Sequence, residues 1–337
     1  MSFEALWYRK KWRLLSLLLL PLSWLYGLGA KLHRNFSRPQ KVAGLQIVSV
    51  GNIVVGGAGK TPLVIWLAQW AQATGKRVVV LSRGYGRTSK ELVHFNARSI
   101  PSVTTVGDEP ALIARRCPGV EVWVGADRLE LAQVALKHGA QIAILDDGFQ
   151  HHRLARDVDV VIAGDLGNAR LLPAGPLREP VSALKRAHVI VQRGDDDLQA
   201  RDLSAPRVNA QWEITGFTDE MGKAAQASQL SGLPVIAVSG IARPLEFERQ
   251  LRALGADVKA SLSFADHQNF SDADLRTIRA LSTHHRARVI TTEKDRERLG
   301  SRLEVLTTRY ELRVTAGVSA LSKVLGWPED LVPHSKH

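Results

Sequence analysis

Cysteine is nearly absent from this chain of 337 residues, which contains only Cys117. A single thiol cannot form an intramolecular disulfide, so the fold must depend on its apolar core, and a reducing compartment is compatible with it. The apolar fraction of 45% and the charged fraction of 23% are ordinary for a folded protein. The length allows two domains, and no internal repeat is evident.

Acidic residues are scarce at the N-terminal end, where residues 1–41 contain eight Lys or Arg and only one acid, Glu4. This arm carries +7 of the net charge of +12, so the rest of the chain carries only +5. A nucleic-acid-binding protein usually shows a basic surface on its folded body, so we expect no nucleic-acid partner. The basic surface that could seek a partner is the N-terminal arm.

The arm also contains an uncharged apolar segment, residues 14–30 (LLSLLLLPLSWLYGLGA). Its seventeen residues are at the lower limit for a membrane-spanning helix, and Pro21 weakens it further. A cleaved signal peptide, a buried core helix and an uncleaved anchor that lies on the membrane are the three possible interpretations. Basic flanks on both sides, together with Trp7, Trp12 and Trp24, favour an anchor on an anionic membrane surface.

From residue 46 onward, short β-branched runs alternate with helical stretches. We predict strands at residues 46–50, 77–81, 102–106, 120–124, 141–145, 159–164 and 188–192. This alternation predicts an α/β fold with a mostly parallel sheet of the P-loop NTPase type, flanked by helices. Ligands of such sheets bind at the carboxyl ends of the strands.

A polar segment at 193–207 marks a boundary, after which a second α/β unit begins. Its predicted strands are 233–240, 258–264 and 288–292, and Ser271 with Asp274 predicts the start of a helix. We therefore divide the chain into an N-terminal membrane-anchoring helix with basic flanks (1–40), a nucleotide-binding kinase domain (41–205) and a smaller lobe that closes over the active site (206–337).

Residues 52–62 (NIVVGGAGKTP) end like a phosphate-binding loop, although the opening glycine of that motif is replaced by Val54. The loop lies between a predicted strand and a predicted helix, which is the context that the motif requires. Its backbone N–H groups, its lysine and its hydroxyl suit phosphate and magnesium. The predicted nucleotide-binding residues here are Gly56, Gly57, Ala58, Gly59, Lys60 and Thr61.

Asp146 and Asp147 end a hydrophobic strand, where a nucleotide site needs an acid for its metal, although acids also cap strands. Beside a phosphate-binding loop, we favour metal coordination, directly or through water. The sequence shows no GTPase signature, because "DDG" lacks the Asp-x-x-Gly spacing and Lys294 stands next to Asp295 in "TTEKD". ATP is therefore the expected nucleotide.

"GDEP" places Asp108 and Glu109 after a further predicted strand. Asp108 could accept a proton from a hydroxyl acceptor, and it could equally well cap a helix. "SRGYGR" offers Arg83 and Tyr85, and "LLPAGPLRE" offers Arg178, for phosphate or sugar groups, although a single arginine is more often a solvated surface charge.

Eight motifs in order, together with the apolar segment, cover nearly the whole chain. They are VGNIVVGGAGKTP, SRGYGR, VGDEP, DDGFQHH, LLPAGPLRE, SGIARP, FADHQNF and TTEKD. In this combination the sequence resembles the tetraacyldisaccharide 4'-kinase (lipid A 4'-kinase) family. Val54 is no departure from that family, where the outer glycine is also missing.

The resemblance implies a P-loop kinase that uses ATP and Mg²⁺ on the cytoplasmic face of the inner membrane. It implies transfer of the γ-phosphate to the 4'-hydroxyl of a tetraacylated glucosamine disaccharide 1-phosphate, in lipid A biosynthesis. The partners implied are this lipid-linked disaccharide and an anionic membrane surface, with no protein partner required. A membrane-associated ATPase that acts on a partner, or a non-enzymatic nucleotide-binding scaffold, remain the alternatives.

The resemblance also assigns roles to matching residues. It implies Asp108 as the base, paired with His267 of "DHQNF", and a catalytic role for Lys60. The implied metal ligands are Thr61, Asp146, Asp147 and Glu109, and Gln150 is implied at the nucleotide. The implied substrate-binding residues are Arg83, Tyr85, Arg128 and Arg178.

Overall fold

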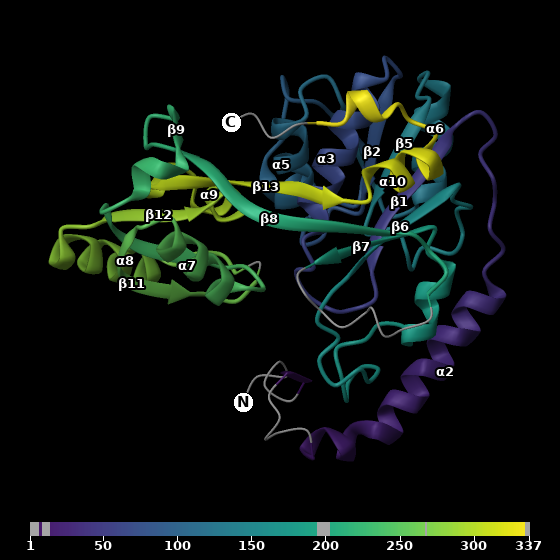
Figure 1. Ribbon diagram of the computed structural model, residues 1–337, viewed down its shortest axis with the longest axis horizontal. Helices are drawn as coiled ribbons and strands as arrows, with labels where there is room; N and C mark the ends of the chain where they lie inside the picture. The colour runs from purple at the N-terminus through teal and green to yellow at the C-terminus, as the bar shows by residue number, and fades with distance from the viewer. Residues whose placement is uncertain (1–6, 9–13, 194–202, 267, 334–337) are drawn as a thin grey trace.

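The computed structural model describes residues 7–8, 14–193, 203–266 and 268–333. Over these ranges the chain forms two α/β lobes that share one sheet, and Figure 1 shows the second lobe projecting from the side of the first. The sheet has 13 strands, in the order β11-β10-β12-β13-β8-β7-β6-β1-β5-β2-β4-β3, with β9 paired to β8. The predicted α/β fold with a mainly parallel sheet is confirmed.

The first lobe consists of the strands from β7 to β3, with helices on both faces. Its strands are β1 (Gln46–Asn52), β2 (Val78–Ser82), β3 (Val93–Phe95), β4 (Glu121–Val124), β5 (Ile142–Asp146), β6 (Val158–Ala163) and β7 (Val189–Arg193). Its helices are α3 (Lys60–Ala73), α4 (Val103–Val106), α5 (Asp108–Arg116), α6 (Arg128–Lys137) and the 3-10 helix η3 (Val181–Arg186). Because strand side chains alternate, Val48 packs in the core with α3, whereas Ile47 packs in the core with α6.

Two long strands join the lobes. β8 (Arg207–Thr218) pairs in parallel with β7, and β13 (Leu306–Ala316) pairs in parallel with β12 of the second lobe. β8 and β13 are antiparallel to each other, and the short strand β9 (Ala224–Gln226) pairs antiparallel with the end of β8. The first lobe therefore continues into the second through a hydrogen-bonded ribbon and not through a single flexible linker.

The second lobe is a smaller parallel sheet with its own apolar cores. Its elements are η4 (Ala227–Leu230), β10 (Pro234–Ser239), α7 (Pro244–Ala253), β11 (Asp257–Ser263), α8 (Asp272–His285), β12 (Arg288–Thr292), α9 (Glu293–Leu299) and η5 (Gly300–Arg302). Alternate residues of β10 face the two cores: Val235 packs with α7, and Ile236 packs with α8. The predicted helix start is confirmed as a capping box, in which Ser271 accepts from the N–H of Asp274.

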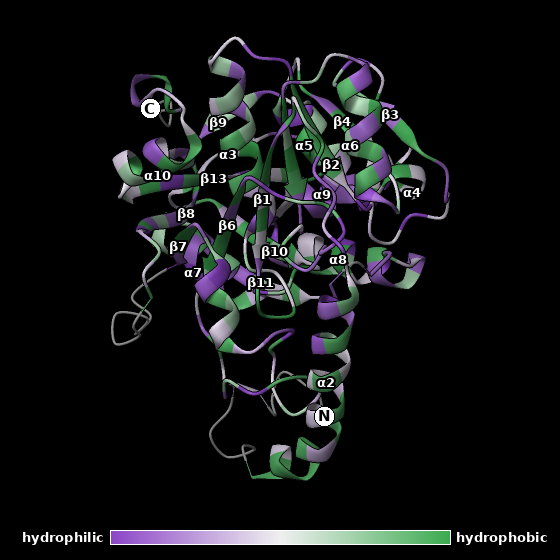
Figure 2. Cartoon of the chain, turned by 90° about the vertical axis from the view of Figure 1, so that its right-hand side faces the viewer, coloured by the Kyte–Doolittle hydropathy of each residue, from purple (hydrophilic) through white to green (hydrophobic). Residues whose placement is uncertain are grey.

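The apolar N-terminal segment is helical and lies beside the first lobe. A 3-10 turn, η2 (Leu15–Leu19), leads into α2 (Leu20–Phe36), and together they are long and apolar enough to cross a membrane. Figure 2 shows α2 extending away from the body of the molecule. Because only a small part of this helix is buried, the interpretation as a buried core helix is wrong.

Two sequence predictions about strands need correction. Residues 102–106 were predicted as a strand but form α4, because β3 occupies the edge of the sheet beside β4 and the chain must turn at Gly107. The sequence interpretation also missed β8 and β13. Both are half-exposed, so charged and polar residues interrupt their apolar pattern, but the alternation of Val208, Ala210 and Trp212 is a signal that could have identified β8.

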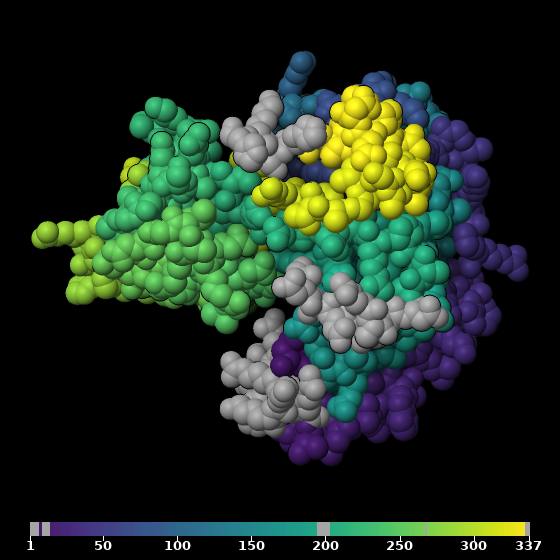
Figure 3. All heavy atoms as spheres, in the orientation of Figure 1, coloured from purple at the N-terminus to yellow at the C-terminus, as the bar shows by residue number. Residues whose placement is uncertain are grey.

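The C-terminal segment packs on the first lobe, although the predicted division at residue 206 placed it in the second. α10 (Val318–Leu325) and η6 (Glu329–Leu331) follow β13, and Figure 3 shows these residues (yellow) lying over the first lobe. Trp327 is buried there, with its ring 5.6 Å from that of Trp70 and its indole N–H donated to Gln46. The rest of the predicted division stays a prediction.

Removal of this tryptophan should destabilise the first lobe. We expect Trp327→Ala to lower the free energy of unfolding by about 3–5 kcal/mol, because it empties a fully packed site. Trp24→Ala, at a tryptophan that is 71% exposed on α2, is the matched control and should change it by less than about 0.5 kcal/mol. Urea denaturation of the detergent-solubilised protein measures both, and equal losses would contradict this assignment.

Candidate active site

The glycine loop lies between β1 and α3, as the sequence predicts. Gly56 and Gly59 have φ angles of 100° and 85°, in the left-handed region that side chains disfavour, and Gly59 immediately precedes the first residue of α3, Lys60. A Cβ on Gly57 would lie 2.9 Å from the Cβ of Ala242, which belongs to the "SGIARP" loop of the second lobe. Gly56 and Gly57 are exposed, and the SGIARP loop of the second lobe lies close to Gly57.

Trp212 of β8 contacts the glycine loop. Its indole N–H donates to the carbonyl oxygen of Gly59 at 3.0 Å, and a Cβ on Gly59 would lie 2.4 Å from that nitrogen. Only glycine therefore fits this position, for its φ angle and for the contact with Trp212. The ribbon that joins the lobes reaches the phosphate-binding loop directly.

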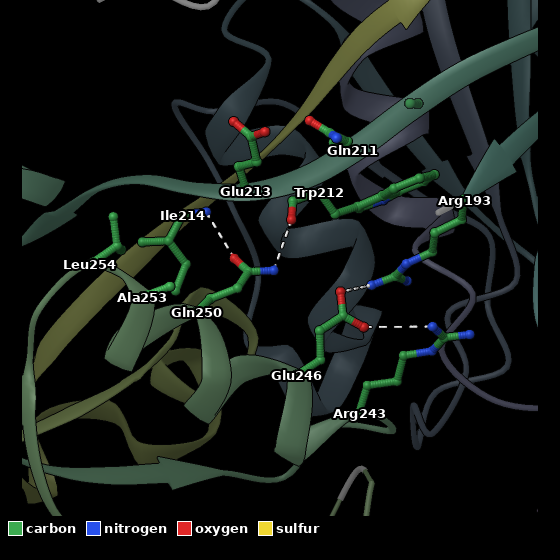
Figure 4. Close-up of a pocket in the computed structure, with 11 residues that line it drawn as sticks. Arg193, Gln211, Trp212, Glu213, Ile214, Arg243, Glu246, Gln250, Ala253 and Leu254 are labelled. Atoms are coloured by element: carbon green, nitrogen blue, oxygen red, sulfur yellow. Dashed lines mark hydrogen bonds and ion pairs between the residues drawn. The ribbon is translucent and has the colours of Figure 1, made fainter. Parts of the chain in front are cut away.

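A cavity of about 530 Å³ lies beside this contact, where β8 meets α7. Figure 4 shows the Glu246 carboxylate between Arg193, at 2.5 Å, and Arg243, at 3.5 Å. Gln250 donates to the Trp212 carbonyl and accepts from the Ile214 N–H. These hydrogen bonds and ion pairs join the ends of β7 and β8 to α7, so they stabilise the junction between the two lobes.

Asp147 is held between two cations. Its carboxylate lies 3.4 Å from the Lys60 ammonium and 2.9 Å from the Arg178 guanidinium, and its own φ angle is 54°. Burial alone would raise the pKa of Asp147, but Lys60 and Arg178 outweigh it and hold that pKa below its ordinary value. Asp147 therefore carries a charge that orients the lysine of the phosphate-binding loop.

Asp146 has the opposite electrostatic environment. It is buried, accepts a hydrogen bond from Ser82 at 3.0 Å, and lies near the negative charges of Glu109 and Asp147. Burial and these two carboxylates raise the pKa of Asp146 to about 7, against the opposing effect of Lys60. Adjacent aspartates thus differ in their affinity for protons because only one of them is paired directly with cations.

Asp108 is buried at the start of α5, close to the second lobe. The residue before the helix is Gly107, and the Asp108 carboxylate accepts from the next backbone N–H at 3.1 Å. Two cations of α9 lie close to this carboxylate: the Lys294 ammonium at 4.0 Å and the Arg298 guanidinium at 3.7 Å. Because Gly107 is the N-cap of α5 and no side chain caps this helix, the predicted cap role of Asp108 is wrong. Its carboxylate instead faces cations of the second lobe.

Lys294 connects three carboxylates from the two lobes. Besides Asp108, its ammonium lies 3.3 Å from Glu109 of the first lobe and 3.3 Å from Asp266 of the second. Burial alone would lower the pKa of Lys294, but Glu109, Asp108 and Asp266 raise it overall. The sequence interpretation missed this role; the position of "TTEKD" after a strand was the available signal. His267 lies outside the described residues, so its predicted pairing with Asp108 stays a prediction.

The other predicted site residues surround this centre. Arg128 is buried at the start of α6, where burial and Arg83 lower its pKa against the effect of Asp146 and Asp147. Arg83 and Tyr85 are exposed on the loop after β2. Gln150 donates to the carbonyl of Asn52 and to Glu179, both absent from the predicted set.

The predicted metal ligands suit a magnesium ion that is bound mainly by nucleotide phosphates. Within the described part of the chain, no group of three His, Cys, Asp or Glu side chains is placed to hold a metal without other ligands. Magnesium in nucleotide sites typically takes one or two carboxylates, phosphate oxygens and water. Asp146 and Glu109 repel each other, and a cation between them would relieve this repulsion. Asp147, in contrast, is already paired with Lys60 and Arg178.

A glycine loop before a helix, a lysine aimed at it and acids at the end of the neighbouring strand define a P-loop phosphotransferase. A family model described as tetraacyldisaccharide-1-P 4'-kinase matches residues 15–325. The chain belongs to this family.

Individual relatives agree with this assignment. The tetraacyldisaccharide 4'-kinase of Anaeromyxobacter dehalogenans is 41% identical over 301 residues, covering 81% of this chain and 80% of that protein. That of Parvibaculum lavamentivorans is 39% identical over 313 residues, covering 91% and 89%. The crystal structure of LpxK from Aquifex aeolicus in complex with ATP is similar with a TM-score of 0.77 and 31% identity, over 95% of this chain and 100% of that one.

The predicted family, enzyme class and cofactors are thereby confirmed. The protein is an ATP-dependent kinase with an alcohol acceptor, of a family in the lipid A pathway, and Mg²⁺ is the usual metal of such kinases. The roles of individual residues stay predictions, because no comparison tests them.

The raised pKa of Asp146 predicts a pH dependence of stability in the absence of nucleotide and magnesium. Between its ordinary value of 3.8 and about 7, folded Asp146 keeps a proton that the unfolded chain has released. Its contribution to stability is therefore lost as the pH rises through this window. In thermal denaturation, Asp146→Asn should lose part of this decline, whereas Asp330→Asn, at an exposed position, should keep it. Identical pH profiles of wild type and Asp146→Asn would contradict the raised pKa.

Proposed function

We propose that this chain transfers the γ-phosphate of ATP to the 4'-hydroxyl of a tetraacylated glucosamine disaccharide 1-phosphate, with Asp108 as the base. The product is the 1,4'-bisphosphate. The observation that carries the proposal is a buried carboxylate on the first lobe, facing cations of the second lobe, in a member of this kinase family. Donor loop, base and acceptor-binding arginines all come from this one chain.

The reaction makes one bond and breaks one. The oxygen of the 4'-hydroxyl attacks the γ-phosphorus, the bond from that phosphorus to the β–γ bridging oxygen breaks, and ADP leaves. The hydroxyl proton passes to the Asp108 carboxylate as the new bond forms. Asp108 suits this step because it is buried and thereby shielded from water.

The residues around the phosphates stabilise and orient them. The backbone of Gly56 to Gly59 binds the phosphates, and Lys60, oriented by Asp147, reaches the β- and γ-phosphates. Thr61, Asp146 and Glu109 would hold magnesium, and the ion would supply positive charge to neutralise charge that develops on the phosphate oxygens. Gln150, bonded to the end of β1, borders the nucleotide side.

Three arginines and a tyrosine form the acceptor side. Arg178 presents a guanidinium beside Asp147, and Arg128 and Arg83 add positive charge close to the two aspartates. These groups suit the 1-phosphate and the sugar hydroxyls, and Tyr85, which is 65% exposed, offers a flat face to a sugar ring.

The second lobe completes the site when it closes. Lys294 pairs with Asp108 and Glu109 from across the junction. Closure of the second lobe over the nucleotide-binding domain (residues 41–205) would exclude water from the active site. This would limit hydrolysis of ATP in the absence of acceptor.

A transfer assay separates this proposal from a partner-driven ATPase. Purified protein receives magnesium, γ-labelled ATP and the detergent-solubilised tetraacyl disaccharide 1-phosphate. Asp108→Asn should reduce label transfer at least about a hundredfold, because it removes the proton acceptor, with little change in the KM for ATP. The matched control is Asp272→Asn, an exposed acid in the first turn of α8, which should keep full activity.

Release of label only as free phosphate, equally in wild type and Asp108→Asn, would contradict the kinase proposal and favour the ATPase.

The N-terminal helix supports a location on the cytoplasmic face of the inner membrane. Its outer side is apolar and exposed, with Leu18, Leu22 and Leu25 at 77%, 54% and 66% exposure. Its inner side binds Asn168 and Arg170 through Ser16, and a full span would draw these polar groups into the hydrocarbon. We therefore favour a helix that lies in the anionic interface over one that crosses it.

Vesicle binding tests this arrangement. Replacing Leu18, Leu22 and Leu25 together by Gln should lower co-sedimentation with phosphatidylglycerol-containing vesicles at least about tenfold, since the stripe supplies apolar area. Leu245→Gln, at a leucine that is 66% exposed on the second lobe, should have no effect. Undiminished binding of the triple variant would mean that another surface holds the membrane.

A further inference from the structure

The helix α2 binds the protein body through its smallest residues. Ser16 and Ser23 are 0% and 3% exposed, whereas the leucines on the opposite side are open. A Cβ on Gly27 would lie only 2.7 Å from the side chain of Leu171, so the helix and the loop that follows β6 are in close contact. The seam between them is lined by serine hydroxyls and a glycine, unlike the apolar seam of an ordinary packed helix.

The Ser23 hydroxyl is both an acceptor and a donor of hydrogen bonds with that loop. Its hydroxyl oxygen accepts from the backbone N–H of Ala174 at 3.0 Å and lies 2.9 Å from the carbonyl oxygen of Leu171, to which it can donate. The carbonyl of Leu19, one turn earlier in the helix, is farther away at 3.3 Å. The loop bonds satisfy Ser23 in both of its hydrogen-bonding capacities.

Ser16, in the 3-10 turn η2, makes a second contact about two turns earlier. Its hydroxyl accepts from the Arg170 guanidinium at 2.6 Å and from the Asn168 amide at 3.3 Å. The indole N–H of Trp7 donates to the carbonyl of Pro173 at 3.0 Å. Contacts from the N-terminal arm therefore converge on residues 168–174.

The same loop is bonded to the phosphate-binding loop. The N–H of Leu172 donates to Leu177, and the N–H of Leu177 donates to Arg170, so the loop closes on itself. From there, the N–H of Arg178 donates to the carbonyl of Ile53 at 2.8 Å, and Pro176 accepts from Val55 at 2.8 Å. The loop that Ser23 contacts therefore continues, through its own backbone hydrogen bonds, into the segment that carries Arg178.

We propose that Ser23 is a positioning residue for the lipid acceptor: it fixes the membrane-facing helix to the loop that carries Arg178. The inference rests on the proposed function. The acyl chains of the acceptor share the membrane with α2 while its polar head must meet Arg178, so a fixed distance between the two aligns the 4'-hydroxyl with the phosphates. The backbone of the glycine loop and Lys60 would bind ATP directly, so we expect ATP binding to depend less on this distance than acceptor binding does.

The loop also contains hydrogen bonds that do not involve Ser23. The N–H of Gly175 donates to Leu171, and the Asn168 amide donates to Ala174, so the turn has its own hydrogen bonds. Loss of the Ser23 hydroxyl therefore loosens the docking of the helix more than it disturbs the turn. This separates a positioning role from a purely structural one.

The test is steady-state kinetics of label transfer in detergent, with acceptor and ATP varied separately. Ser23→Ala should raise the KM for the acceptor roughly tenfold, the usual effect of losing a hydrogen bond to buried groups, with the KM for ATP unchanged. Ser23→Thr, which keeps the hydroxyl, should restore the acceptor KM. Ser37→Ala is the matched control, because this serine binds only the end of its own helix.

An unchanged acceptor KM in Ser23→Ala would overturn the inference while the kinase function stood. Equal changes in both KM values together with a lowered melting temperature would also overturn it, in favour of a structural role. If Ser23→Ala does not fold, Ser16→Ala tests the same contact and should also raise the acceptor KM selectively. Absence of transfer by the wild-type protein would instead refute the proposed function.

Discussion

The charge contact of Asp147 with Lys60 and Arg178 holds the site together. This contact joins three parts of the first lobe: Lys60 at the start of α3, Asp147 after β5, and the loop that carries Arg178 and contacts α2. Asp147 reaches both cations because its backbone adopts a left-handed conformation, which the surrounding elements must stabilise. With this carboxylate occupied by cations, the neighbouring Asp146 faces Glu109 and is left as the group that gains most from a metal ion.

The two lobes meet through charge and through backbone, and these connections differ in kind. β8 and β13 form a continuous hydrogen-bonded ribbon, and Trp212 on it supports the glycine loop. Lys294 and Arg298 instead reach Asp108 by side chains alone.

The apolar N-terminal segment and the candidate active site are connected by one structural route. The apolar leucines of α2 face outward, and the serines of the same helix bind residues 168–174, which continue to Arg178 and the glycine loop. Under the proposed function, in which the acceptor is lipid-linked, such a connection would hold the phosphate donor at a fixed distance from the lipid. In this fold the docked helix and the phosphate-binding loop are only one short loop apart.

The sequence by itself determined the phosphate-binding loop, the acids at the ends of strands and the alternation that gives a parallel sheet, because each depends on residues close together in the chain. It did not reveal β8 and β13, because their half-exposed residues give only a weak alternating pattern. It also did not reveal that residues 102–106 are helical: their β-branched residues favour a strand, but β3 already occupies the edge of the sheet beside β4. Only the tertiary structure decided that Lys294 meets Asp108, that Ser23 meets Ala174 and that Trp327 covers the first lobe. Those contacts join residues more than 100 positions apart, and no local propensity encodes them.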